Sequence, residues 1–140
     1  MSDRPTVLFL CVRNAGRSLA ARVLLERYAA GRVEVLSAGS EPGDQLDPSV
    51  VAILTERGLD TSREFPKPVT DVTDGTARAS DVIVTMGCGD ACPVYPGQRR
   101  LDWELADPAG LSVDEVRAIV DEIDRRVRAL LEELVPPDPA

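Results

Sequence analysis

An apolar segment followed by a polar, glycine-containing loop lies near the start of the chain, where residues 6–18 read TVLFLCVRNAGRS. Residues 6–10 are almost entirely apolar, which is typical of a buried strand. Residues 11–18 then have the composition of a loop. Residues 19–28 are rich in helix-forming side chains and end before Gly31, which predicts a helix. A buried strand that leads through a loop into a helix indicates an α/β fold.

The same alternation of strand and helix continues along the chain. Further strands are predicted at residues 33–37, 81–86 and 99–103. Asp47 and Pro48 have the pattern of an N-cap followed by proline at the first helical position, so a helix is expected between them and Gly58.

The last predicted helix has the clearest sequence signal. Ser112 and Glu115 form a capping box, and Pro136 and Pro137 end the helix. Apolar side chains recur between them at three- and four-residue steps, as one helix face against a sheet requires: Val116, Ile119, Val120, Ile123, Val127, Leu130, Leu131 and Leu134. We therefore predict one three-layer α/β domain over residues 1–135, with a four-stranded parallel sheet and helices on both faces, and a disordered tail over 136–140.

Length and charge exclude several classes of protein. The 140 residues suffice for one domain, and 16 basic against 24 acidic residues give a net charge of −8. This charge argues against nucleic acid or an acidic membrane surface as a partner. No apolar run approaches the ~20 residues that span a bilayer, and the N-terminus lacks a signal peptide's features. A soluble, cytoplasmic protein is expected.

The chain contains three cysteines and no histidine. Mechanisms with an imidazole base and metal sites with an imidazole ligand are therefore excluded. An odd number of cysteines is a poor disulfide framework for a cytosolic chain, so the thiols are either inert core residues or reactive groups. We predict neither a metal site nor a cofactor.

The loop after the first strand is the predicted reaction centre, because ligands of α/β sheets bind at the carboxyl ends of strands. Its backbone N–H groups are expected to form an anion-binding nest, and Arg17 adds a bidentate guanidinium group for a tetrahedral oxyanion. The predicted oxyanion-binding residues are Val12, Arg13, Asn14, Ala15, Gly16, Arg17 and Ser18.

The same positive field favours the thiolate form of Cys11, to which Ser18 can donate a hydrogen bond. Asn14 tolerates left-handed dihedral angles and is expected to maintain the loop shape. Arg13 either attracts oxyanions or belongs to the solvated surface. The alternative for Cys11 is a small buried hydrophobe at the end of a core strand. The strand before the loop, the helix after it and the two polar side chains favour the oxyanion loop.

The pattern Cys11-x5-Arg17-Ser18 resembles the low-molecular-weight protein tyrosine phosphatase family. Residues 37–43 (SAGSEPG), 81–89 (DVIVTMGCG) and 103–110 (WELADPAG) make the chain similar to the arsenate reductases built on that phosphatase fold. The resemblance covers about residues 7–134. It implies the phosphatase fold and the reduction of arsenate to arsenite, a reaction of arsenic detoxification.

Asp107 precedes Pro108 in a predicted loop, where an aspartate is by itself most often a turn residue. The resemblance implies that Asp107 is the general acid that protonates a departing oxygen. Ala109 and Gly110 occupy positions at which phosphatases of this family typically carry aromatic residues. Aromatic residues make up only 4% of the chain, which favours arsenate, with phosphate or sulfate as competing ions, over phosphotyrosine.

Cys88 and Cys92 are four residues apart, so one helical turn would bring them near the Cα separation of ~4.4–6.8 Å that a disulfide needs. Flanking glycine and proline residues would weaken such a turn and let it rearrange. The pair could instead be structural, or Cys88 alone could act. A zinc site is a further alternative, although two thiols without histidine fall short of four ligands.

The resemblance favours a disulfide relay, in which Cys11 attacks arsenate, Cys88 resolves the adduct and Cys92 passes a redox-active disulfide to thioredoxin. Some family members space the cysteine pair further apart. Actinobacterial relatives use mycothiol and typically lack the pair, so its presence favours thioredoxin over mycothiol-dependent reduction. The other hypotheses are a low-molecular-weight tyrosine phosphatase and a non-catalytic oxyanion-binding or redox-sensing module.

Overall fold

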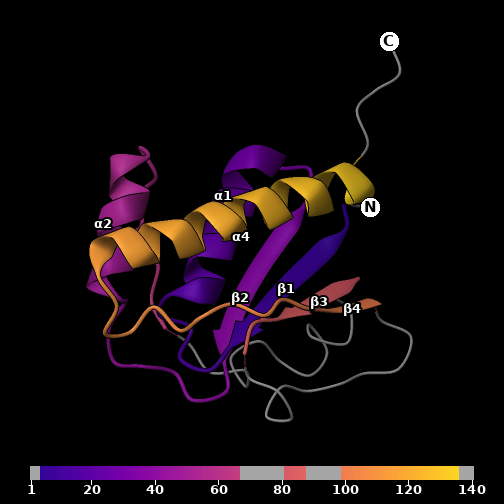
Figure 1. Cartoon of the computed structure of the whole chain (residues 1–140). Helices are drawn as coiled ribbons and strands as arrows, with labels where there is room; N and C mark the ends of the chain where they lie inside the picture. Colours follow the sequence, from indigo (N-terminus) through magenta and orange to yellow (C-terminus); the bar gives the residue numbers. More distant parts are fainter. Residues whose placement is uncertain (1–3, 67–80, 88–98, 136–140) are drawn as a thin grey trace.

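Four parallel strands form one sheet with the order β2-β1-β3-β4 (Figure 1). The computed structural model describes residues 4–66, 81–87 and 99–135. The strands are β1 (Thr6–Cys11), β2 (Glu34–Gly39), β3 (Val82–Thr85) and β4 (Arg99–Asp102). The predicted four-stranded parallel sheet in an α/β domain is confirmed. Because β1 lies between β2 and β3, the carboxyl end of β1 is in the middle of the sheet edge.

The strand β2 extends further than its sequence pattern predicts. We expected it to end at Ser37, but it continues to Gly39 because Leu10 pairs with Ala38 and Cys11 pairs with Gly39. This pairing places the end of β2 beside Cys11, where the loop begins.

Alternate side chains of β1 contribute to two apolar clusters on opposite faces of the sheet. Val7, Phe9 and Cys11 belong to the larger one, which also contains buried side chains of α1 (Arg17–Ala29), α2 (Pro48–Glu56) and α4 (Val113–Leu134). The smaller cluster consists of Leu8, Leu10, Ala38 and Ile83, with Val12 and Leu36 packed against it. The three described helices thus cover one face. Residues 67–80 and 88–98, which precede β3 and β4, lie outside the described residues.

The capping box of α4 is confirmed. The backbone N–H of Glu115 donates to Ser112 Oγ at 3.2 Å, and the Ser112 N–H donates to Glu115 Oε1 at 3.3 Å. Figure 1 shows α4 lying across α1 and α2. Five of its predicted apolar residues are buried, and Ile119, Leu131 and Leu134 are partly buried. The predicted tail, residues 136–140, lies outside the described residues.

The helix α1 begins two residues earlier than predicted. Arg17 and Ser18 belong to its first turn instead of to the loop, and the Ala20 N–H donates to the Gly16 carbonyl at 2.9 Å. The N-cap of α2 is as predicted, since Asp47 Oδ1 accepts from the backbone of Ser49 at 2.9 Å. None of the described helices has both the length and the apolar composition needed to cross a membrane.

Candidate active site

The Cys11 thiol lies at the carboxyl end of β1 and is only 2% exposed. Its Sγ is 2.9 Å from Ser18 Oγ and accepts the backbone N–H of Asn14 at 3.2 Å. The Asn14 side-chain Nδ2 donates to Ser18 Oγ at 2.7 Å. Ser18 Oγ thus accepts from this amide, and either Oγ or Sγ can be the donor in the contact between them. The Cys11 sulfur, the atom that acts as nucleophile in cysteine-based reactions, therefore lies within hydrogen-bond distance of a backbone N–H and a hydroxyl group.

Asn14 adopts the left-handed conformation expected of it, with φ of 52°, and is buried. Asparagine tolerates this region better than most residues. The turn at Asn14 brings its own N–H back toward Cys11 Sγ, three residues earlier in the chain. Asn14 therefore both shapes the loop and orients the Ser18 hydroxyl group.

The carbonyl groups of the loop are bonded to the connection between β2 and α2. The carbonyls of Cys11, Val12, Arg13 and Ala15 accept backbone N–H groups of residues 40, 41, 43 and 47 at distances between 2.7 and 3.1 Å. In a trans peptide the following N–H points opposite to the carbonyl. These peptides therefore direct their N–H groups toward the inside of the loop, as the predicted anion nest requires.

Gly39 makes this close contact between loop and connection possible. A Cβ atom at residue 39 would lie 2.6 Å from the Val12 carbonyl oxygen and 2.9 Å from the Asn14 nitrogen. Both are backbone atoms that cannot move aside without deforming the loop. The sequence marks Gly39 only as part of the SAGSEPG segment, because a contact between the end of one strand and the loop after another leaves no periodic signal.

The Arg17 side chain contacts the backbone of two further connections, those that follow β3 and β4. Its Nη1 donates to the Leu105 carbonyl at 3.2 Å, and the residue is only 9% exposed. Gly87 has φ of +97°, and a Cβ atom there would lie 2.4 Å from Arg17 Nη1. The guanidinium group is thus enclosed by backbone on two sides. These contacts hold the guanidinium group at the pocket.

A small pocket opens over Cys11 and Arg17. Its lining residues come from the loop, from the start of α2 and from the connection between β4 and α4: Cys11, Arg13, Ala15, Gly16, Arg17, Asp47, Asp107, Pro108 and Ala109. Among the residues that the structure describes, no aromatic side chain lines this pocket. The structure therefore brings together the predicted nucleophile, arginine and acid, and Arg13 lies at the same pocket.

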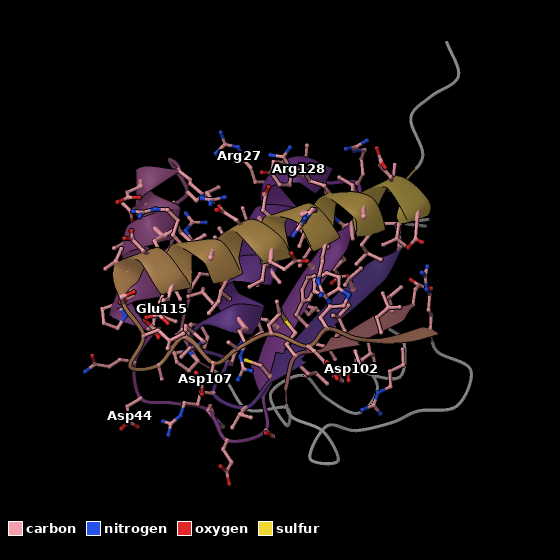
Figure 2. The ribbon with its side chains drawn as sticks, viewed as in Figure 1. Arg27, Asp44, Asp102, Asp107, Glu115 and Arg128 are labelled. Atoms are coloured by element: carbon pink, nitrogen blue, oxygen red, sulfur yellow. The ribbon has the colours of Figure 1, made fainter. Side chains whose placement is uncertain are left out.

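Asp107 is exposed, and its Oδ1 accepts the Ala109 N–H at 3.0 Å. Figure 2 shows it in the connection that leads into α4. Pro108 is buried against the loop, since a Cβ atom at Gly16 would lie 2.9 Å from Pro108 Cγ. The contact between Gly16 and Pro108 positions the predicted acid at the pocket.

Three of the predicted oxyanion-binding residues do not line the pocket. The Val12 side chain packs against the smaller apolar cluster, and Asn14 and Ser18 are buried behind Cys11. Asp47 lines the pocket although the sequence analysis treated it only as a helix cap. The N-cap role of Asp47 fully explains why aspartate precedes Pro48, so the sequence contains no additional sign that Asp47 lines a pocket.

Cys88 and Cys92 lie outside the described residues, so the relay remains a prediction. Cys88 directly follows Gly87, whose backbone packs against Arg17. Within residues 4–66, 81–87 and 99–135, no group of three or more cysteine, aspartate or glutamate side chains is placed to hold a metal ion.

Comparison with known proteins identifies the relatives of this chain. The family profile described as low molecular weight phosphotyrosine protein phosphatase matches residues 6–137. A putative arsenate reductase of Halobacterium salinarum is 35% identical over 135 residues, which cover 93% of both chains.

Two of the solved structures that share the fold are arsenate reductases. A thioredoxin-dependent arsenate reductase of Corynebacterium glutamicum has a TM-score of 0.82 and 50% identity over 95% of this chain, which spans only 63% of that protein's chain. An arsenate reductase in the phosphate-binding state has a TM-score of 0.82 and 30% identity, covering 93% of this chain and 98% of the other.

Proposed function

The chain belongs to the low molecular weight phosphotyrosine protein phosphatase family, and we propose that within this family it is an arsenate reductase. One observation carries the proposal: a pocket holds the Cys11 thiol, the Arg17 guanidinium group and the Asp107 carboxyl group together, and none of its described lining residues is aromatic. Such a pocket suits a small tetrahedral oxyanion, and its described part offers no ring to hold a phosphotyrosine side chain.

The first step is nucleophilic attack. The loop N–H groups and Arg17 hold arsenate, and the Cys11 thiolate attacks the arsenic atom. Asp107 donates its proton to the departing oxygen, which leaves as water. The product is a covalent adduct with a bond between Cys11 Sγ and arsenic, which is still in its oxidised form.

The second step transfers two electrons. The Cys88 thiolate attacks Cys11 Sγ, the sulfur–arsenic bond breaks, and its electron pair leaves with arsenic as arsenite. Cys92 then attacks Cys88, which moves the disulfide to the Cys88–Cys92 pair and restores the Cys11 thiol. Thioredoxin reduces this last disulfide by exchange. Gly87 packs against Arg17, and Cys88 is the next residue in the sequence. This position in the chain supports the proposed attack of Cys88 on Cys11.

The named relatives support the same reaction. An H. salinarum relative of nearly the same length is called a putative arsenate reductase, and the 50% identical C. glutamicum structure is called thioredoxin-dependent. This chain spans only 63% of the C. glutamicum protein. We therefore propose thioredoxin as the reductant of this chain and do not take it over from that relative. We place the reaction in the cytoplasm, where thiols are kept reduced.

The test is arsenite release by wild type and by each Cys→Ser variant, with either thioredoxin or mycothiol plus a glutaredoxin as the only reductant. Cys11→Ser is expected to lower the rate at least about 10³-fold with both reductants, because it removes the nucleophile. Cys88→Ser and Cys92→Ser are expected to lose multiple turnovers with thioredoxin.

Three outcomes would change the proposal. Full turnover of Cys92→Ser with thioredoxin would contradict the relay. Activity of the wild type with mycothiol alone would assign the other reductant. If wild type releases no arsenite with either system but hydrolyses a phosphotyrosine peptide rapidly, the protein is a phosphatase.

A further inference from the structure

Asp47 places a carboxylate in a pocket built for an anion. We propose that Asp47 makes this pocket selective for tetrahedral oxyanions that carry a proton, such as hydrogen arsenate and hydrogen phosphate, over sulfate. The inference rests on the proposed function, since it concerns the same oxyanion pocket. It assigns the discrimination between similar ions to one side chain outside the Cys11–Ser18 loop.

Asp47 is fixed in place from two directions. Its backbone N–H donates to the Ala15 carbonyl of the loop at 2.9 Å, so the residue moves with the pocket wall. Its Oδ1 accepts the backbone N–H groups of Ser49 at 2.9 Å and Val50 at 3.4 Å, at the start of α2. Within the described part of the chain, no hydrogen bond engages the second oxygen, Oδ2. The capping bonds thus hold Oδ1, and Oδ2 is the oxygen that the proposal assigns to a bound ion.

Acidic groups line the pocket, so an oxyanion that binds there brings its oxygens close to theirs. A hydrogen bond between two such oxygens needs a proton. The pocket is lined by three acidic groups, those of Cys11, Asp47 and Asp107, and by two guanidinium groups, those of Arg13 and Arg17. An anion that enters adds further negative charge at contact distance, where the surroundings are only partly screened by water. In the proposed reaction Asp107 brings its own proton. The proposal assigns the proton between Asp47 and the ion to the ion.

An ionised carboxylate can only accept hydrogen bonds. Near neutral pH arsenate and phosphate keep at least one proton in a large share of the population, and the resulting hydroxyl group can donate to Asp47. Sulfate has the same shape but no proton, so it would place a bare oxygen against Asp47 Oδ2. Loop amides and the arginine fork recognise all three ions alike. Discrimination therefore depends on the one fixed acceptor, as in sites where a single unmatched polar group excludes a close analogue.

The test compares the dissociation constants of inorganic phosphate and of sulfate, measured by calorimetry on the reduced protein near neutral pH. Wild type is expected to bind phosphate at least about tenfold more tightly than sulfate, which is the weight of one charged hydrogen bond. In Asp47→Asn this ratio should fall about tenfold, mainly because sulfate gains affinity. Asparagine is as good an N-cap as aspartate, so α2 keeps its start.

Asp44→Asn is the matched control. Asp44 is exposed on the same connection between β2 and α2, does not line the pocket, and points away from the sheet in Figure 2. The substitution changes the net charge by the same amount, and the phosphate-to-sulfate ratio should stay at the wild-type value.

The inference is overturned if wild type binds sulfate as tightly as phosphate, a result that needs no variant. It is also overturned if Asp47→Asn tightens both ions by the same factor, because the carboxylate then acts only through its charge, or if the variant changes neither. The measurement requires no turnover. A protein that binds phosphate selectively but releases no arsenite keeps the inference and contradicts the proposed function, while a protein that binds neither ion contradicts both.

Discussion

At the scale of single residues, the site depends on a short chain of hydrogen bonds from Asn14 through Ser18 to Cys11. The sequence predicted the Ser18 contact and the left-handed Asn14, because both follow from local geometry within one loop. It did not predict Asp47 in the pocket or Gly87 against Arg17. These contacts join segments far apart in the chain, and no local pattern encodes them.

Ser18→Ala tests this hydrogen-bond chain. The variant removes the hydroxyl group that lies 2.9 Å from Cys11 Sγ and that accepts from Asn14 Nδ2. We expect the alkylation rate of Cys11 by iodoacetamide near neutral pH to fall about tenfold, because a hydrogen bond to a charged group contributes about 1.5 kcal/mol or more to the thiolate.

Ser37→Ala is the control, since Ser37 is also buried but lies on β2, where it pairs with Phe9. Its alkylation rate should match the wild type. An unchanged rate in Ser18→Ala would show that Ser18 only packs beside the thiol.

At the scale of elements, the site is assembled by the connections that follow β1, β2, β3 and β4. Types and approximate positions of the described helices and strands were predictable, because periodicity and capping are local properties. The ends of the helices and strands were less predictable. The strand β2 continues to Gly39 through its pairing with β1. The helix α1 starts at Arg17 because the Gly16 carbonyl is its first acceptor. Both shifts occur next to the loop, where tertiary contacts determine the backbone.

Gly16→Ala tests how the acid is positioned. The added Cβ would lie 2.9 Å from Pro108 Cγ, so the Asp107–Pro108 segment has to move away from the loop. A displacement of about 1 Å in a catalytic group can cost about 10²-fold in rate. We expect kcat for arsenite release to fall between tenfold and about 10²-fold, while the phosphate dissociation constant changes less.

Gly43→Ala is the matched control for this prediction. A Cβ atom at residue 43 meets its nearest neighbour at 3.6 Å, which is ordinary contact, and Gly43 also bonds to the loop through its backbone. Its kcat should stay near the wild-type value. Equal losses in the two variants would mean that the loop, and not the position of Asp107, limits the rate.

At the scale of the whole molecule, the strand order brings the reacting groups to one place. With β1 between β2 and β3, the ends of three strands meet around Cys11, and β4 leads into the connection that carries Asp107. Sequence patterns indicated four parallel strands but not their order, which depends on long-range pairing. The net charge of −8 gave no sign of an anion pocket, since inward N–H groups and Arg17 create a local field that the total charge does not reveal.

The central claim is that thiols of this chain supply the two electrons that reduce arsenate. A single-turnover experiment tests it most directly: fully reduced protein is mixed with arsenate and no external reductant, and arsenite and free thiols are counted. The account predicts about one arsenite released and two thiols lost per chain, and neither change in Cys11→Ser. Wild-type protein that keeps all three thiols and releases no arsenite would contradict it.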